Sequence, residues 1–101
     1  MRIIVLFNLK PGVNAAEYEN WARRTDIPGV RALRSCDDFQ VYRATGLFGS
    51  DEKPPYAYIE TIDINGVDAF VADVTTDAVQ KVAAEFQGFA DNPLFITTEA
   101  L

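Results

Sequence analysis

The sequence predicts an α+β domain with the ferredoxin-like order βαββαβ, in which helices cover one face of a four-stranded antiparallel sheet. Its 101 residues are the length of one domain, so residues 1–101 are expected to form a single folding unit. Four segments are rich in β-branched and aromatic residues, and amphipathic stretches lie between them. The order of these segments along the chain predicts the order of the elements.

The first two elements are a strand and a helix. Residues 2–9 are mostly β-branched or aromatic and predict a strand that is apolar on both faces until Asn8. Asn14 then fits a helix N-cap. The side chains that follow at helical spacing are Tyr18, Trp21, Ala22 and Thr25. The sequence therefore predicts an amphipathic helix over residues 15–26, ended by the Pro-Gly pair at residues 28–29.

A long strand and a loop are expected next. Residues 30–45 fit one bent strand, in which residues 35–38 form either a bulge or a tight hairpin. Residues 46–55 contain two glycines, two prolines and three charged side chains. This composition is typical of a loop, and one of this length could close over a ligand.

The rest of the chain predicts a third strand, an interrupted helix and a last strand. Residues 56–62 alternate in polarity, as a half-buried strand does. A helix begins at Asp63 or Asn65, restarts after a Thr-Thr-Asp run and ends at Gly88. Residues 94–99 follow an Asn-Pro pair and complete the predicted sheet.

The first strand is apolar on both of its faces. Ile4 and Leu6 point to one face, and Val5 and Phe7 point to the other. Helices can cover only one of these faces, and each large apolar side chain left in water forgoes about 1.5–3 kcal/mol. We therefore expect a homodimer packed through the sheet face, with a ligand-sized cavity between sheet and helix or between subunits.

Composition excludes several classes of function. The chain has no histidine, which rules out Ser-His-Asp and Cys-His relays and histidine metal ligands. Cys36 is the only cysteine, which fits a reducing cytoplasm and leaves no cysteine zinc site. A net charge of −6 disfavours nucleic acid, and the longest apolar run, residues 3–7, is too short for a membrane span. We expect a cytoplasmic protein with no metal, no nucleotide cofactor, and neither a nucleic-acid nor a membrane partner.

A family resemblance adds to this picture. The element order, the opening run MRIIVLFNLKPGV and the run YENWAR at residues 18–23 together resemble the REDY-like proteins over nearly the whole chain. The resemblance implies a dimeric α/β barrel built on a ferredoxin-like protomer. It also implies an association with prodigiosin biosynthesis, in the making of the bipyrrole half of prodiginine pigments. No catalytic signature accompanies it, so candidate residues come from their own chemistry.

The candidate catalytic residues lie on the predicted third strand. Glu60 alternates with Tyr58 and Tyr56, so its carboxyl group can share a space with one or both phenols. A carboxylate among aromatic rings can have a raised pKa and act as a general acid/base, or it can accept a hydrogen bond from a pyrrole N–H. Glu60 and Tyr58 are the predicted catalytic pair and Tyr56 a ligand contact. The alternative is a solvent-facing or ion-paired Glu60 beside interface tyrosines.

Four further side chains are candidate ligand contacts. The Asn8 amide could bond a carbonyl or pyrrole N–H, or else bond the backbone of a turn. Tyr18 and Trp21 could stack on a flat conjugated ligand, or else pack in the core. Arg23 could bind a carboxylate, or else remain a solvated surface side chain.

Two hypotheses follow for the function. In the first, a homodimer holds a small aromatic or pyrrolic intermediate in a cavity over the sheet, and any catalysis is cofactor-free carboxylate and tyrosine acid/base chemistry. In the second, the chain is a non-enzymatic subunit or chaperone that docks on a larger pigment-biosynthesis enzyme through its acidic surface and the loop of residues 46–55.

Overall fold

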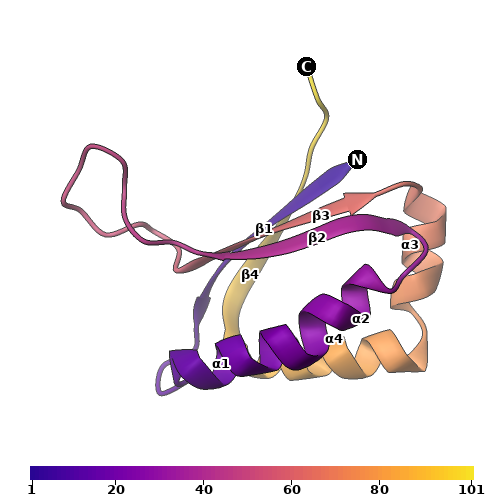
Figure 1. Cartoon of the computed structure of the whole chain (residues 1–101), viewed down its shortest axis with the longest axis horizontal. Coiled ribbons are helices and arrows are strands. Elements are labelled where there is room, and N and C mark those ends of the chain that lie inside the picture. The colour runs from indigo at the N-terminus through magenta and orange to yellow at the C-terminus, as the bar shows by residue number, and fades with distance from the viewer.

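The computed structural model describes residues 1–101 and confirms the predicted α+β class and its ferredoxin-like order. One antiparallel sheet has the strand order β2-β3-β1-β4. The strands are β1 (Arg2–Leu9), β2 (Cys36–Arg43), β3 (Tyr58–Ile64) and β4 (Ala90–Thr97). The helical segments are α1 (Ala15–Trp21), the π-helical η1 (Ala22–Asp26), α2 (Ile27–Arg31), α3 (Val67–Val74) and α4 (Asp77–Phe89). Helices lie on one side of the sheet and leave the other side open (Figure 1).

Two predicted boundaries around the second strand are wrong. The Pro-Gly pair at residues 28–29 lies inside a continuous helical run over residues 15–31, because the wider π turn of η1 directly before Pro28 accommodates a residue that cannot donate to the carbonyl four residues back. The predicted strand over residues 30–45 is therefore only β2, from Cys36 to Arg43. Of the two alternatives for residues 35–38, the bulge is the one found, between Cys36 and Asp38.

Three further boundaries move in the second half. Tyr56 precedes β3, which begins at Tyr58. Gly88 lies within α4 instead of ending it. β4 begins at Ala90 and runs through Pro93, which an edge strand tolerates because a proline there need not donate to a neighbour.

The two sheet faces differ in how they are covered. Val5, Phe7 and Ile62 face the helices and are buried in a core that contains Tyr18 and Phe86. The opposite face is also apolar, as predicted, and lacks cover from this chain. Its large side chains are Ile4, Leu6, Tyr42, Ile59, Leu94 and Ile96, of which the tyrosine and the two on β4 are exposed.

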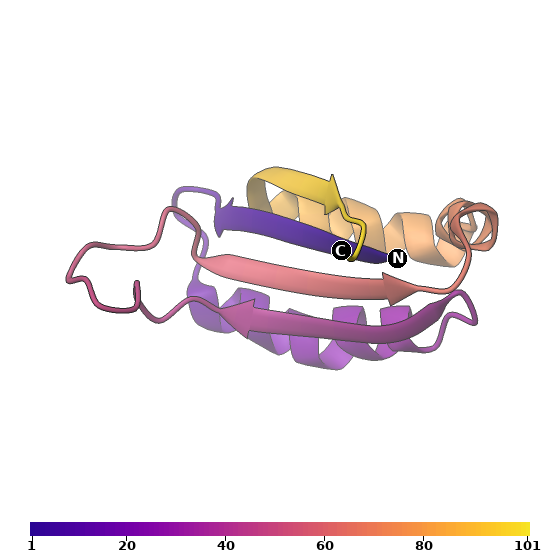
Figure 2. The same ribbon diagram turned by 90° about the horizontal axis from the view of Figure 1, so that it is seen from above.

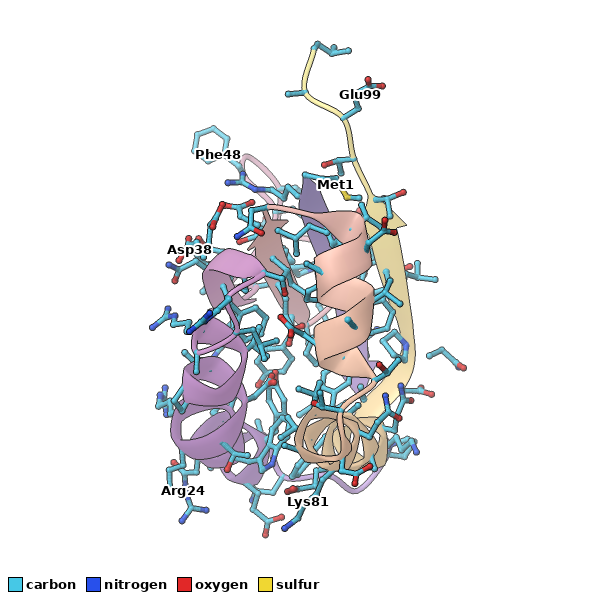
Figure 3. All side chains as sticks on the ribbon, turned by 90° about the vertical axis from the view of Figure 1, so that its right-hand side faces the viewer. Met1, Arg24, Asp38, Phe48, Lys81 and Glu99 are labelled. Carbon is cyan, nitrogen blue, oxygen red and sulfur yellow. The ribbon has the colours of Figure 1, made fainter.

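The loop between β2 and β3 projects from the body of the molecule. It reaches beyond the end of the sheet and rises on the side away from the helices (Figures 1 and 2). A tight turn with a Leu47–Ser50 bridge forms its tip, and Gly49 there has a φ of 77°, a conformation that favours glycine. Phe48 at this tip is fully exposed and stands away from the rest of the chain (Figure 3).

The helices are all short, and none is both long and apolar enough to cross a membrane.

Candidate functional site

A cavity of about 150 Å³ lies between the sheet and the helices. Its walls are mostly apolar, and two carboxyl groups, from Asp26 and Glu60, reach it. The other lining residues are Val30, Phe39, Ile62, Val74, Val79, Val82, Ala83, Phe86, Gln87 and Phe95. Two acids in one small apolar space are unusual, because charged groups are expensive to bury without a partner.

Glu60 is held inside the molecule by the alternation of β3. It pairs with Val5 on β1 and Val41 on β2, so it shares their helix-facing side of the sheet. The residue is only 4% exposed, and its Oε2 atom has no hydrogen-bond partner. Burial, and next the charge of Asp26, raise the pKa of Glu60 to about 8, against an opposing effect of the Tyr18 hydroxyl. The sequence-based hypothesis of a raised pKa at Glu60 thus has a physical cause in the structure.

Asp26 reaches the cavity from the π-helical segment. The Ile27 N–H donates to Ala22 O, five residues back, so this turn holds one more residue than an α-helical turn. Regular helical spacing places both Thr25 and Asp26 near the inner face, and in the structure Asp26 is the buried one, at 6% exposure. Burial raises the pKa of Asp26 to about 7.

Sequence reasoning did not single out Asp26. It lies four residues after Ala22, so helical spacing places it close to the apolar stripe, but the expected end of the helix at this point left it without a role. No sequence signal announces the π turn itself.

Tyr18 supplies a third polar atom near the two acids. The residue is fully buried, and its hydroxyl has no hydrogen-bond partner. Burial, together with the charge of Glu60, raises the pKa of the phenol, so it stays protonated. Its ring meets Phe7 edge-on at 5.6 Å between centroids, which fixes the hydroxyl in place. An unpaired donor and an unpaired acceptor, Glu60 Oε2, are thus both buried here.

The Tyr58 hydroxyl is hydrogen-bonded outside this pair of acids. It donates to Glu19 Oε2 at 2.7 Å, and Arg43 Nε donates to the same oxygen at 2.8 Å. A second Arg43 nitrogen contacts Glu19 Oε1. The Arg43 and Tyr58 hydrogen bonds lower the pKa of Glu19 to about 2, while burial and the Glu19 contact raise the pKa of Tyr58 to about 12. Glu19 and Arg43 were not among the candidates from sequence.

This ionic cluster borders a second hollow of about 310 Å³ near the β2 edge. Arg23 lies on its rim, with Nη2 at 3.5 Å from Glu19 Oε1. Arg23, predicted to bind an acidic ligand, thus lies beside a hollow that could hold one. Glu19 already contacts its guanidinium group and would compete with such a ligand.

The remaining candidates lie elsewhere. Trp21 is buried, its Nε1 donates to Glu85 Oε2 at 3.0 Å, and its ring lies 6.5 Å from that of Phe86, which lines the cavity. Asn8 anchors the projecting loop: its Nδ2 donates to Pro55 O at 3.1 Å and its Oδ1 accepts from Ala57 N at 2.8 Å. Tyr56 is half-buried in the same loop and does not share the alternation of Tyr58 and Glu60.

Chemically, the arrangement can move protons and hold a hydrogen-bonding ligand. Two carboxyl groups with pKa values of about 7 and 8 together hold between one and two protons at neutral pH, because Asp26 is half ionised where Glu60 is still mostly protonated. No group of three or more acidic or cysteine side chains comes together in the arrangement of a metal site.

Fold and topology first place the chain among ferredoxin-like α+β proteins. Its backbone superimposes on a dimeric ferredoxin-like protein of Thermobifida fusca with a TM-score of 0.72 at 18% identity, over 94% of this chain and 85% of that one. It is similarly close to SnoaB, described as a cofactor-independent oxygenase from Streptomyces nogalater, with a TM-score of 0.73 at 14% identity, over 99% and 93% of the two chains. At these identities the likeness establishes the fold.

The sequence identifies the family. Residues 1–101 match the family described as REDY-like protein HapK, so the chain belongs to that family. The crystal structure of HapK from Hahella chejuensis is similar to it, with a TM-score of 0.75 at 26% identity, over 100% of this chain and 95% of that chain. No curated protein sequence gives a significant match. The resemblance noted from the opening run and residues 18–23 is confirmed.

Proposed function

We propose that the chain binds a small pyrrole or bipyrrole intermediate of prodiginine pigment synthesis in the Asp26–Glu60 cavity and transfers protons to and from it. The observation that supports this most is the buried, unpartnered Glu60 Oε2 beside Asp26 in an otherwise apolar cavity. The Tyr18 hydroxyl lies near enough to Glu60 to lower its pKa, so a ligand N–H at this oxygen would compete with the phenol. Membership of the HapK family supports the biosynthetic context.

The proposed chemistry needs only the two acids. The protonated carboxyl of Glu60 gives its proton to a carbon of the electron-rich ring, and ionised Asp26 or the resulting Glu60 carboxylate removes a proton from that carbon to restore the aromatic ring. Tyr18 is not part of the cavity wall, and its hydroxyl acts on Glu60, whose pKa it lowers, and not on the ligand. Tyr58 takes no direct part in this proposal, because its hydroxyl donates to Glu19 and the residue lines the neighbouring hollow.

The working molecule in this proposal is a homodimer joined through the open sheet face. Several apolar side chains on that face, including Leu94 and Ile96, are exposed in the single chain. A second copy with the same face covers them by two-fold symmetry. The Asp26–Glu60 cavity lies on the other side of the sheet, so the dimer leaves it free.

Proton transfer can be tested by hydrogen–deuterium exchange at the ring carbons of 2,2′-bipyrrole in D₂O, followed by ¹H NMR. We expect the protein to accelerate the exchange, and Glu60→Gln to abolish the acceleration while Trp21 fluorescence still reports binding, since Trp21 packs near Phe86 on the cavity wall. The control is Glu99→Gln, an exposed acid near the C-terminus. Acceleration that survives in Glu60→Gln would remove Glu60 as the acid/base.

A second candidate function is docking on a larger biosynthetic enzyme. The fully exposed Phe48 at the tip of the projecting loop favours it, because aromatic side chains are enriched in protein–protein interfaces. The two functions are distinguished by co-sedimentation of purified pigment-biosynthesis enzymes with the wild-type protein and with Phe48→Ser. Docking predicts binding that Phe48→Ser weakens, whereas the ligand-binding function predicts no effect of this change on bipyrrole exchange.

A further inference from the structure

The Asp26–Glu60 cavity has a closed end and an open end. At the closed end lie Asp26, Glu60 and Phe39, all buried. At the open end lie Ala83, Gln87 and Phe95, all exposed. The cavity therefore runs from the two acids outward to the edge of the sheet, between α4 and β4. A molecule that reaches the acids by this route passes Phe95.

Phe95 is unusual for a residue on the inner side of the sheet. It pairs with buried Val5 across β1 and β4, so its side chain faces the helix layer, yet it is 56% exposed. Its ring meets that of Phe86 edge-on, with centroids 6.4 Å apart. β4 is the outer strand of the sheet on the α4 side (Figure 2), and nothing in the chain covers the outer face of this ring.

The size of the cavity limits what fits beside the acids. A cavity of about 150 Å³ with apolar walls holds one benzene-sized ring. A second linked ring has to remain beyond the open end, against the uncovered outer face of the Phe95 ring. The two ends thus offer different contacts: a hydrogen-bond acceptor at Glu60 Oε2 inside, and an aromatic surface at Phe95 outside.

From this we infer that the site takes a ligand of two linked flat rings end-on, with an N–H-bearing ring against Glu60 and the second ring stacked on Phe95. This inference rests on the proposed function and adds an orientation, an entrance and a specificity residue. Phe95 acts on the second ring alone. The proposed sheet-face dimer does not cover it, because Phe95 faces the opposite side of the sheet from Leu94 and Ile96.

The test compares one-ring and two-ring probes by isothermal titration calorimetry. Phe95→Ala and Phe95→Leu are expected to weaken 2,2′-bipyrrole by about 2- to 10-fold, the range for loss of one aromatic contact, and to leave pyrrole within about twofold. Phe95→Tyr, which keeps the ring, is expected to retain wild-type affinity for both probes. The matched control is Val71→Ala, which removes an exposed apolar side chain on α3 away from the cavity.

Each outcome decides between the two claims. Equal weakening of pyrrole and 2,2′-bipyrrole binding in Phe95→Ala, or no weakening of either, overturns the end-on orientation but leaves the proposed function standing if Glu60→Gln still abolishes the acceleration of bipyrrole exchange. Failure of both probes to bind the wild-type protein contradicts the proposed function and the orientation together. If Phe95→Leu loses as much affinity for 2,2′-bipyrrole as Phe95→Ala does, stacking on the aromatic ring is supported. If Phe95→Leu keeps the wild-type affinity, the size of the side chain is sufficient and stacking is contradicted.

Discussion

Two residues, Asp26 and Glu60, place acids inside a protein of 101 residues, and this arrangement has a thermodynamic consequence. Their pKa values of about 7 and about 8 lie well above the ordinary values of roughly 4 for carboxyl groups in an unfolded chain. Between about pH 4 and pH 8 the folded state therefore binds more protons than the unfolded state. The contribution of these two acids to the free energy of unfolding is therefore complete below this pH window and is lost as pH rises through it.

We expect the free energy of unfolding to decrease by the order of a few kcal/mol between pH 5 and pH 9, as measured by urea denaturation. In the double variant Asp26→Asn, Glu60→Gln the amides cannot ionise, so most of this decrease should disappear. Glu99→Gln, at an exposed position, should keep the wild-type dependence. Equal pH dependence in the wild type and the double variant would contradict the burial of ionisable acids.

At the scale of elements, the π-helical segment and the projecting loop are the features that sequence patterns missed or left open. The π turn is invisible to helical periodicity, because one extra residue in η1 changes which side chain faces inward without changing composition. The sequence correctly predicts a loop at residues 46–55. Its attachment to the sheet depends on the hydrogen bonds of Asn8 with Pro55 and Ala57, which lie 47 and 49 residues further along the chain, and local sequence patterns do not contain such long-range contacts.

The Asn8 anchor leads to a prediction about this loop. Asn8→Ala removes two hydrogen bonds to the backbone of Pro55 and Ala57, and should cost about 1–2 kcal/mol of stability and increase proteolytic cleavage within residues 46–55. If Asn8 only anchors the loop, the affinity for pyrrole should not change. Unchanged cleavage together with weaker pyrrole binding would instead favour the direct ligand contact expected from the sequence.

Other element boundaries show how tertiary context overrides local signals. Pro28 lies inside a helical run that continues past the predicted helix end, directly after the π turn of η1, and Pro93 lies within β4 and not at its predicted boundary. Pro93 is tolerated because an edge strand does not need every backbone N–H, and Pro28 because the π turn already departs from regular α-helical hydrogen bonding. The strand and helix order survived these errors because it depends on the long apolar segments. The inward position of Glu60 was likewise predictable from alternation, whereas its companion Asp26 was not.

For the molecule as a whole, the open sheet face is the largest feature that one chain leaves unexplained. Leu94 is exposed at its edge and is a core position of the proposed homodimer. Leu94→Glu should convert the dimer to monomers in analytical ultracentrifugation at micromolar concentration, since it places a charge in an apolar interface on both subunits. Val67→Glu, an equally exposed apolar position on α3, should leave the dimer intact. A wild type that sediments as a monomer would contradict the dimer.

The buried, proton-holding pair of Asp26 and Glu60 can be observed by ¹³C NMR of the side-chain carboxyl carbons during a pH titration. We expect the Asp26 and Glu60 signals to titrate near pH 7 and 8, and to be the carboxyl signals that shift when pyrrole is added at pH 7. Titration of both groups near pH 4, with no response to pyrrole, would contradict the account.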